Sequence, residues 1–383
     1  MNEAESKALE LCFHASINEI NAYEWNDLAG ISNPFTRHEF LLALENHQCV
    51  GEEYGWFPYH LSVRDSKNSL IGACPLYIKT NSYGEFVFDW SWASAYEQAG
   101  LNYYPKMVCT TPYNPVTGPR LLAKDANIKS IMIQQIIKVA QKLNMSGMHW
   151  LFTNEEETQL CKDNHIQLRL GCQYHWKNQG YISFDDFLST FISRKRKKVK
   201  RERRMVNEQN IDINVIHGDE ASEHQIEQAH QFYTSTFDRK SGIPTLSLGF
   251  FKEICQTMGK QVVFMFALLE NKHVACAITL KSDDALFGRF WGCNQDFHSL
   301  HFETCFYQGI EYCIENKLQR FEPGAQGEHK ITRGFLPTKT WSAHWMNDSQ
   351  FQQAIYTFCQ REEVAMHDQC KELLSLSPYR LDA

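Results

Sequence analysis

Residues 301–335 read HFETCFYQGIEYCIENKLQRFEPGAQGEHKITRGF. In residues 301–316, apolar side chains recur every three to four positions, which predicts an amphipathic helix. Residues 320–324 read as the end of a strand, and residues 320–335 contain three glycines among acids, bases and a histidine. This order predicts an α/β unit whose polar loop is either an ordinary surface loop or a ligand-binding site.

Both halves of the chain show the same expected order of elements. The first half is expected to contain a strand within residues 11–20, a helix ending at Gly30, a helix capped by Thr36, a hairpin of 59–65 and 70–79, a strand at 106–112, a helix at 127–143 and a strand at 147–153. The second half is expected to contain a strand at 211–217, helices at 223–240 and 248–258, and strands within 261–292 before the stretch quoted above. The repeated order predicts a duplicated α/β unit with mixed sheets.

The length of 383 residues favours two domains, because a single core seldom grows that large. We predict domains at residues 1–190 and 211–383, joined by a basic helix at 191–210. Within that helix, Arg194–Arg204 contains nine basic residues and one acid, without proline or glycine. It is either a solvated helix between domains or an anion-binding surface.

Composition excludes several classes of protein. The net charge of −7 argues against a general nucleic-acid binder, and the 43% hydrophobic content is enough for large cores. The thirteen cysteines include no CxxC pair, so buried reduced thiols in a cytoplasmic protein are expected, and no metal site. The N-terminal residues lack the pattern of a signal peptide, and no apolar run is long enough for a membrane span.

Several longer motifs carry a family resemblance. They are NPFTRHEF (33–40), GEFVFDWSWASAYEQAGLNYYPKM (84–107), PYNPVTGPRLL (112–122), FYTSTFDRKSGIPTLS (232–247), GRFWGC (288–293), the stretch 300–338 and SAHW (342–345). With these motifs the chain resembles the FemAB-like branch of the GNAT acyltransferase superfamily, and more narrowly bacterial predicted N-acyltransferases of peptidoglycan biosynthesis and recognition. The resemblance implies two tandem GNAT-like domains and transfer of an acyl or aminoacyl group to an amine acceptor, such as a peptidoglycan precursor or a related metabolite.

One departure bears on the donor. GNAT enzymes hold the pyrophosphate of acetyl-CoA with an [RQ]xxGx[GA] loop at a helix start, and the segments before the helices at 127 and 301 lack it. FemAB-type enzymes take their acyl group from aminoacyl-tRNA. The expected co-substrate is therefore acyl-CoA or aminoacyl-tRNA, with no tightly bound cofactor, and Arg194–Arg204 is the candidate tRNA contact.

Three residues are candidate catalytic groups, because amide formation needs a group that removes the proton of the amine. Glu322 ends a predicted strand, where it is either a base or substrate anchor or the partner of a salt bridge. His329, a side chain that can titrate near neutral pH, is either an acid–base group or an ordinary polar residue of a surface loop. Glu303 is a second-choice base, since a carboxylate in a first helical turn also stabilises the helix.

The candidate substrate-binding residues fall in both halves. In the second half they are Gln326, Lys330 and Arg333 of the glycine-rich loop, together with Arg289, whose place in an apolar strand requires a partner. In the first half they are Lys106 and Arg120, which lie near several tyrosines that form either a pocket or part of the core.

Two other functions remain open from the sequence. The duplicated domains would bind a peptidoglycan precursor or another anionic ligand without reacting, or the basic helix would bind RNA. Nucleophilic catalysis is not favoured, because the sequence has no GxSxG elbow and no Walker A or dinucleotide-binding glycine pattern.

Overall fold

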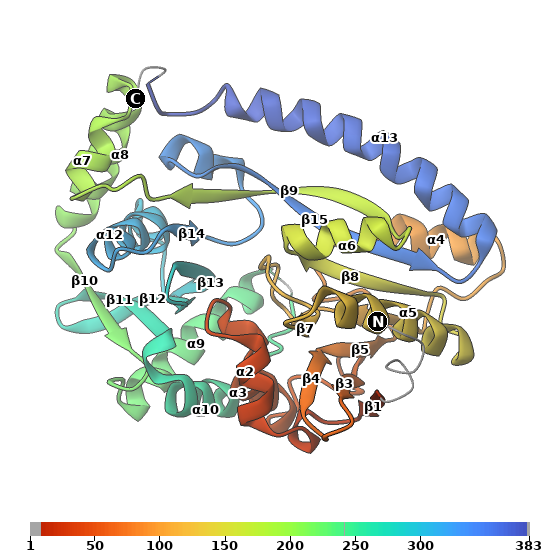
Figure 1. The fold of residues 1–383 in the computed structure, drawn as a ribbon. Helices are drawn as coiled ribbons and strands as arrows, with labels where there is room; N and C mark the ends of the chain where they lie inside the picture. The colour runs from red at the N-terminus through yellow and green to blue at the C-terminus, as the bar shows by residue number, and fades with distance from the viewer. Residues whose placement is uncertain (1–8, 241, 381–383) are drawn as a thin grey trace. The chain divides into compact units, whose positions relative to one another are not determined.

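The computed structural model describes residues 9–240 and 242–380 (Figure 1). They form two compact units. Unit 1 contains the described residues up to Gly171 together with Lys339–His367, and unit 2 contains Cys172–Thr338 together with the described residues from Asp368 onward. The chain therefore passes from one unit to the other three times.

This division differs from the predicted domains at 1–190, 191–210 and 211–383. Strands β9 (Gln167–Lys177) and β15 (Leu336–Met346) each begin in one unit and end in the other. Hydrophobic periodicity identifies a strand but not its non-consecutive neighbours, so reading the chain in order assigned residues 339–367 to the second domain.

Unit 1 contains two sheets. The antiparallel sheet has the order β1-β3-β4-β7, formed by β1 (Glu10–His14), β3 (His60–Arg64), β4 (Leu70–Cys74) and β7 (Leu122–Ala123). The mixed sheet continues from β15 in the order β8-β6-β5-β2, formed by β8 (Gly147–Thr153), β6 (Lys106–Cys109), β5 (Leu76–Lys79) and β2 (Trp56–Pro58). In the mixed sheet, β6 and β8 are parallel.

The helices of unit 1 cover these sheets with apolar faces. They are α2 (Ala22–Ala29), α3 (His38–Asn46), α4 (Trp90–Gln98), α5 (Ala126–Lys142), α6 (Glu155–Asp163) and most of α13 (Ser349–Leu374), with 3₁₀ turns at Ile17–Glu19 and Pro34–Thr36. The predicted helix at 127–143 is α5, and its buried Met132 and Ile136 pack into the core with Leu61 and Trp150. The predicted cap of α3 was wrong, because Arg37 precedes the helix and the Thr36 hydroxyl donates to Asn33 O instead.

Unit 2 has one mixed sheet that begins in the order β10-β11-β12-β13-β14. These strands are β10 (Ile211–His217), β11 (Val262–Leu269), β12 (Lys272–Lys281), β13 (Ala285–Cys293) and β14 (Arg320–Glu322), and β9 follows β14. Its helices are α7 (Phe184–Ser189), α8 (Ser193–Asn207), α9 (Glu223–Lys240), α10 (Leu248–Met258), α11 (Leu300–Phe302) and α12 (Gln308–Glu315), with a π turn at Glu303–Tyr307 and 3₁₀ turns at Gly259–Gln261 and Glu328–Arg333. The predicted mixed α/β fold class is confirmed.

The parallel pair β13–β14 creates the opening that matters for function. The two strands pair from Ala285↔Arg320 to Phe287↔Glu322, where β14 ends while β13 continues to Cys293. The strands are therefore hydrogen-bonded along one short stretch only. In α/β sheets, ligands bind beyond the carboxyl ends of parallel strands at such a position.

Candidate functional site

A cavity of about 270 Å³ lies in unit 2 where the β13–β14 pairing ends. Strand β13 contributes Arg289 and Trp291, and the loop after β14 contributes Gln326 and Lys330. The start of the helix after β13 contributes His301. The cavity therefore combines two cations, an amide and an imidazole with walls of Tyr233, Phe237, Phe290 and Phe306.

Lys330 is a buried cation of this cavity, with 4% of its surface exposed. Its Nζ donates to Gly324 O at 2.7 Å, and the described residues supply no ion pair to it. The left-handed backbone of Gly324, at φ 97°, belongs to the turn that carries this carbonyl. Burial lowers the pKa of Lys330 to about 8. The amine is therefore mostly charged at pH 7, but it loses its proton at a lower pH than an ordinary lysine.

Arg289 lines the cavity, and the buried carboxylate of Glu322 lies near enough to act on its charge. Burial lowers the pKa of Arg289 to about 10, and the charge of Glu322 opposes that shift. Glu322 Oε1 accepts from Arg320 Nε at 3.1 Å, while Oε2 lies 3.8 Å from His175 Nε2 and has no hydrogen-bond partner among the described residues. Glu322, which does not line the cavity, therefore stabilises the charge of Arg289.

Arg333 contacts protein groups rather than open space. Its Nη2 donates to Glu202 Oε1 at 2.7 Å, its Nη1 donates to His329 O at 2.8 Å, and its guanidinium lies 3.5 Å from the centre of the Phe302 ring. Glu202 is the one acid of the basic segment, and it faces inward from α8. The arrangement fastens the glycine-rich loop to α8.

Glu303 is also held by the basic helix. Its carboxylate accepts from Arg203 Nε at 3.1 Å and from Gln308 Nε2 at 2.8 Å, and only 3% of its surface is exposed. The structure therefore places Glu303 and Arg333 in ion pairs of α8, whereas Arg289, Gln326 and Lys330 share the cavity.

Replacing Arg333 with methionine is expected to lower the free energy of unfolding by about 3 kcal/mol, because the Glu202 carboxylate loses its guanidinium partner in a buried setting. The measurement is chemical denaturation. Arg204→Met, which removes an exposed ion pair of the same helix, is the control and should change the free energy by less than about 1 kcal/mol. An Arg333→Met protein with unchanged stability would contradict this structural role.

His329 lies beside the cavity and is exposed. Its ring centre is 5.7 Å from that of Phe306 and 6.4 Å from that of His301. Partial burial and the nearby charges of Arg333, Lys330 and Lys198 lower its pKa, so the imidazole is neutral at neutral pH.

Lys106 is enclosed in the interior of unit 1. Its Nζ donates to Glu85 Oε2 at 2.8 Å, Asp89 Oδ2 at 2.5 Å and Ser82 Oγ at 3.0 Å, and no part of the residue is exposed. These contacts are those of a structural ion cluster.

A directed hydrogen-bond chain continues from this cluster. Tyr103 Oη donates to Asp89 and lies 3.4 Å from His149 Nε2, and His149 Nδ1 lies 2.7 Å from His344 Nδ1. His344 Nε2 lies 2.8 Å from Ser342 Oγ. Because a neutral imidazole has one donor and one acceptor, one assignment satisfies every link: Ser342 donates to His344, His344 to His149, and His149 to Tyr103.

Arg120 is buried and bonded to backbone carbonyls. Its Nε donates to Leu151 O at 2.8 Å and its Nη2 to Val116 O at 2.6 Å. Parallel pairing of β6 with β8 ends at Cys109↔Trp150, and the chain returns to β8 at the Gly118↔Thr153 bridge. In unit 1, Arg120 therefore fixes the loop that follows the parallel pair.

The basic segment forms helix α8, which lies within unit 2 rather than between two domains, and it exposes most of its charge. The exposed basic residues are Arg194, Lys197, Lys198, Lys200, Arg201 and Arg204. Arg203 and the buried Glu202 face inward, so one face holds the unit together and the other is open to solvent.

Sequence reasoning missed part of the cavity. Tyr233 of α9 and Thr279 of β12 line it, yet both lie in segments that look like ordinary core. The π turn at Glu303–Tyr307, which places Cys305 and Phe306 on the cavity wall, has no signature in the sequence.

Among the residues described, no group of His, Cys, Asp or Glu is arranged to hold a metal ion. Within the same residues, no helix combines the length and apolar character needed to cross a membrane.

Known proteins share this fold. A FemAB-like family model, described as peptidoglycan biosynthesis and recognition, matches residues 16–381. No curated protein matches the chain by sequence. The crystal structure of FemX is similar with a TM-score of 0.55 at 10% identity, covering 91% of this chain and all of FemX.

Two further solved structures are similar over most of the chain. The C-terminal domain of a putative lysylphosphatidylglycerol synthetase from Agrobacterium fabrum has a TM-score of 0.54 at 8% identity, covering 89% of this chain and 96% of that one. L-PGS from Bacillus licheniformis has a TM-score of 0.51 at 10% identity, with 86% and 97% covered. FemX and these two proteins share the mixed α/β fold of this chain.

Proposed function

Since this chain belongs to the FemAB-like family of peptidoglycan biosynthesis and recognition proteins, we propose that unit 2 transfers an acyl or aminoacyl group to an amine acceptor. The acceptor is a peptidoglycan precursor or a related metabolite. The observation that carries this proposal is the cavity beyond the β13–β14 pairing, where Arg289 and Lys330 face the same enclosed space.

In this proposal the amine attacks the acyl carbonyl directly. The C–N bond forms, the bond to the leaving group of the donor breaks, and the nitrogen loses one proton. The Lys330 ammonium donates a hydrogen bond to the oxygen that becomes negative, and a donor placed in a water-poor cavity is effective for that purpose. Arg289 binds an anionic group of a substrate, with Glu322 keeping its guanidinium in place.

The nitrogen's proton is assigned to a histidine, which then gives it to the departing oxygen or sulfur of the donor. His301 lines the cavity, and the neutral His329 lies beside it at the exposed side. Glu322 is proposed as the positioning partner of Arg289 rather than as the first proton acceptor, because it does not line the cavity.

The proposed donor is aminoacyl-tRNA, with acyl-CoA as the alternative. Support for tRNA comes from the exposed basic face of α8, and from the absence of the glycine-rich pyrophosphate loop in the sequence before residue 301. Phosphate contacts of this kind weaken steeply with salt.

The test is a transfer assay with the purified full chain. Labelled aminoacyl-tRNAs and acyl-CoAs are offered separately with a soluble muramyl-peptide precursor, and the product is identified by mass spectrometry. Transfer from aminoacyl-tRNA that is lost in the Arg194→Gln, Lys197→Gln and Arg201→Gln triple variant supports the full proposal. Transfer from acyl-CoA alone overturns the tRNA donor, and saturable acceptor binding without turnover of any donor identifies a binding protein instead.

The rate should depend on pH through Lys330. Because burial lowers the pKa of this lysine to about 8, its charge is present below pH 8 and is lost as the pH rises through that value. The expected result is a descending limb of kcat/KM near pH 8, displaced to higher pH in Lys330→Arg. A rate that keeps rising through pH 9 in the unmodified protein would exclude the charged lysine from the reaction.

A further inference from the structure

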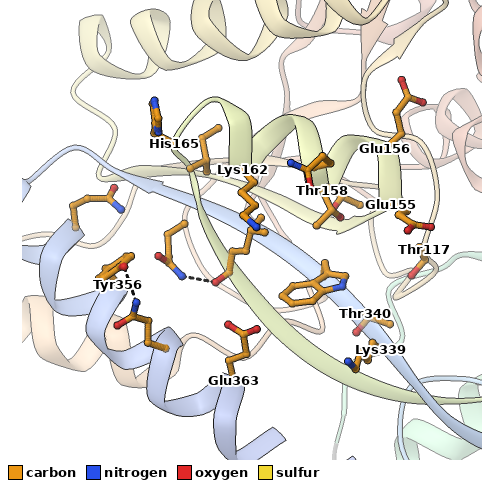
Figure 2. Close-up of a pocket in the computed structure, with 18 residues that line it drawn as sticks. Thr117, Glu155, Glu156, Thr158, Lys162, His165, Lys339, Thr340, Tyr356 and Glu363 are labelled. Carbon is orange, nitrogen blue, oxygen red and sulfur yellow. Dashed lines mark hydrogen bonds between the residues drawn. The ribbon is translucent and has the colours of Figure 1, made fainter. Parts of the chain in front are cut away.

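A second and larger cavity lies in unit 1 and shares no lining residue with the cavity of unit 2. It encloses about 1170 Å³, above the roughly 300–1,000 Å³ of a typical small-molecule pocket. Helix α6 forms one side, and one face of α13 forms the other through Gln352, Tyr356, Gln360 and Glu363. Figure 2 shows Lys162 and Glu363 extending into the space between the two helices. We call this cavity the unit 1 groove.

The lining is polar and has no dominant charge. Fourteen of the eighteen lining residues are polar or charged, and they include four glutamines and four threonines. The acids Glu155, Glu156 and Glu363 lie with the cations Lys162 and Lys339, and Glu156 is already paired with Lys129 at 2.8 Å. A polyphosphate or nucleic acid would find no basic cluster here.

Two aromatic side chains line the groove. Trp341 lies where the register of β15 against β8 shifts, and such a bulge redirects a side chain. Tyr356 is 42% exposed, and its hydroxyl accepts a hydrogen bond from Gln360 at 2.6 Å. The Thr117 hydroxyl is buried and has no hydrogen-bond partner among the described residues.

We propose that the unit 1 groove binds a neutral oligosaccharide chain. Sugar rings offer apolar faces for Trp341 and Tyr356, and their hydroxyls both donate and accept, as amide and threonine side chains do. A cavity of about 1170 Å³ accommodates several linked sugars. Peptide-binding grooves instead use unpaired strand backbone or separate apolar subsites, and only four lining residues here are apolar or aromatic. The inference does not depend on the transfer reaction proposed for unit 2.

The test is calorimetric titration of the full chain, without any acyl donor, using chitotetraose, maltotetraose and tetra-alanine as probes. Saturable binding of at least one tetrasaccharide, weakened about tenfold or more in Trp341→Ala and in Tyr356→Ala, is the expected result. Tyr23→Ala removes an aromatic ring that is 83% exposed elsewhere in unit 1 and should leave the Kd unchanged.

Three outcomes would overturn the proposal: no saturable binding of either saccharide, binding of tetra-alanine alone, or saccharide binding that both groove variants leave intact. Because Tyr356 is a surface residue of α13, its substitution keeps the test valid if Trp341→Ala does not fold.

Discussion

Lys106→Met is expected to lower the free energy of unfolding by about 3–5 kcal/mol, a large part of the stability of an ordinary domain. The substitution leaves Glu85 and Asp89 buried without their shared cation. Burial works to raise the pKa of Asp89, but Lys106 and the surrounding hydrogen bonds outweigh it and hold the value at about 2. Burial raises the pKa of Glu85 to about 7 despite the lysine. Denaturant unfolding followed by circular dichroism measures the loss.

The control is to remove the acids together with the lysine. The triple variant Lys106→Met, Glu85→Gln, Asp89→Asn has no buried charge in this cluster, and we expect it to recover most of the lost stability. If the single variant is as stable as the original protein yet binds substrate poorly, Lys106 is a ligand contact and the structural assignment is wrong.

Lys330→Gln is expected to reduce kcat about 10²–10³-fold, which is the usual effect of removing one preorganised donor to a developing oxyanion. The melting temperature should be unchanged or higher. The pKa of about 8 in the folded protein is below the ordinary lysine value of 10.5. At every pH below 8 the charged lysine therefore lowers the free energy of unfolding, and this destabilisation declines as the pH rises from 8 toward 10.5. Removing the charge removes this destabilisation.

Two substitutions separate chemistry from folding. Lys330→Arg keeps a cation and should retain more activity than Lys330→Gln, whereas Lys272→Gln removes an exposed lysine of the same unit and should have no effect. If the melting temperature of Lys330→Gln falls and the remaining folded protein keeps its normal specific activity, the lysine supports the fold and not the reaction.

Local structure was largely predictable from the sequence, because it depends on patterns that neighbouring residues set. The apolar stripe of α5 and the run of buried residues in β8 gave both elements correctly. The predicted need of Arg289 for a partner agrees with its position near Glu322, since a charge in an apolar strand is costly alone.

The site was less predictable, because it depends on contacts between distant segments. Nothing around Arg333 shows that Glu202, far earlier in the chain, will accept from its guanidinium. The role of Lys106 was equally hard to predict. A lysine close to tyrosines in the sequence suggests a pocket, and only the structure shows that Glu85 and Asp89 enclose it. Cations of a ligand site and cations of a core ion cluster have the same local sequence, and only burial and partners separate them.

The three passages of the chain between units have a consequence for synthesis on the ribosome. Unit 1 needs β15, whose His344 contributes a link to the hydrogen-bond chain, but that strand is translated after nearly all of unit 2. After residues up to Gly171 have been synthesised, β8 therefore lacks its partner β15 until roughly the next 170 residues have been translated. Unit 2 is in the same position for a shorter time, because its last segment follows Asp368. Fragments cut at the middle of the sequence should consequently fail to fold, because each unit then lacks one of its segments.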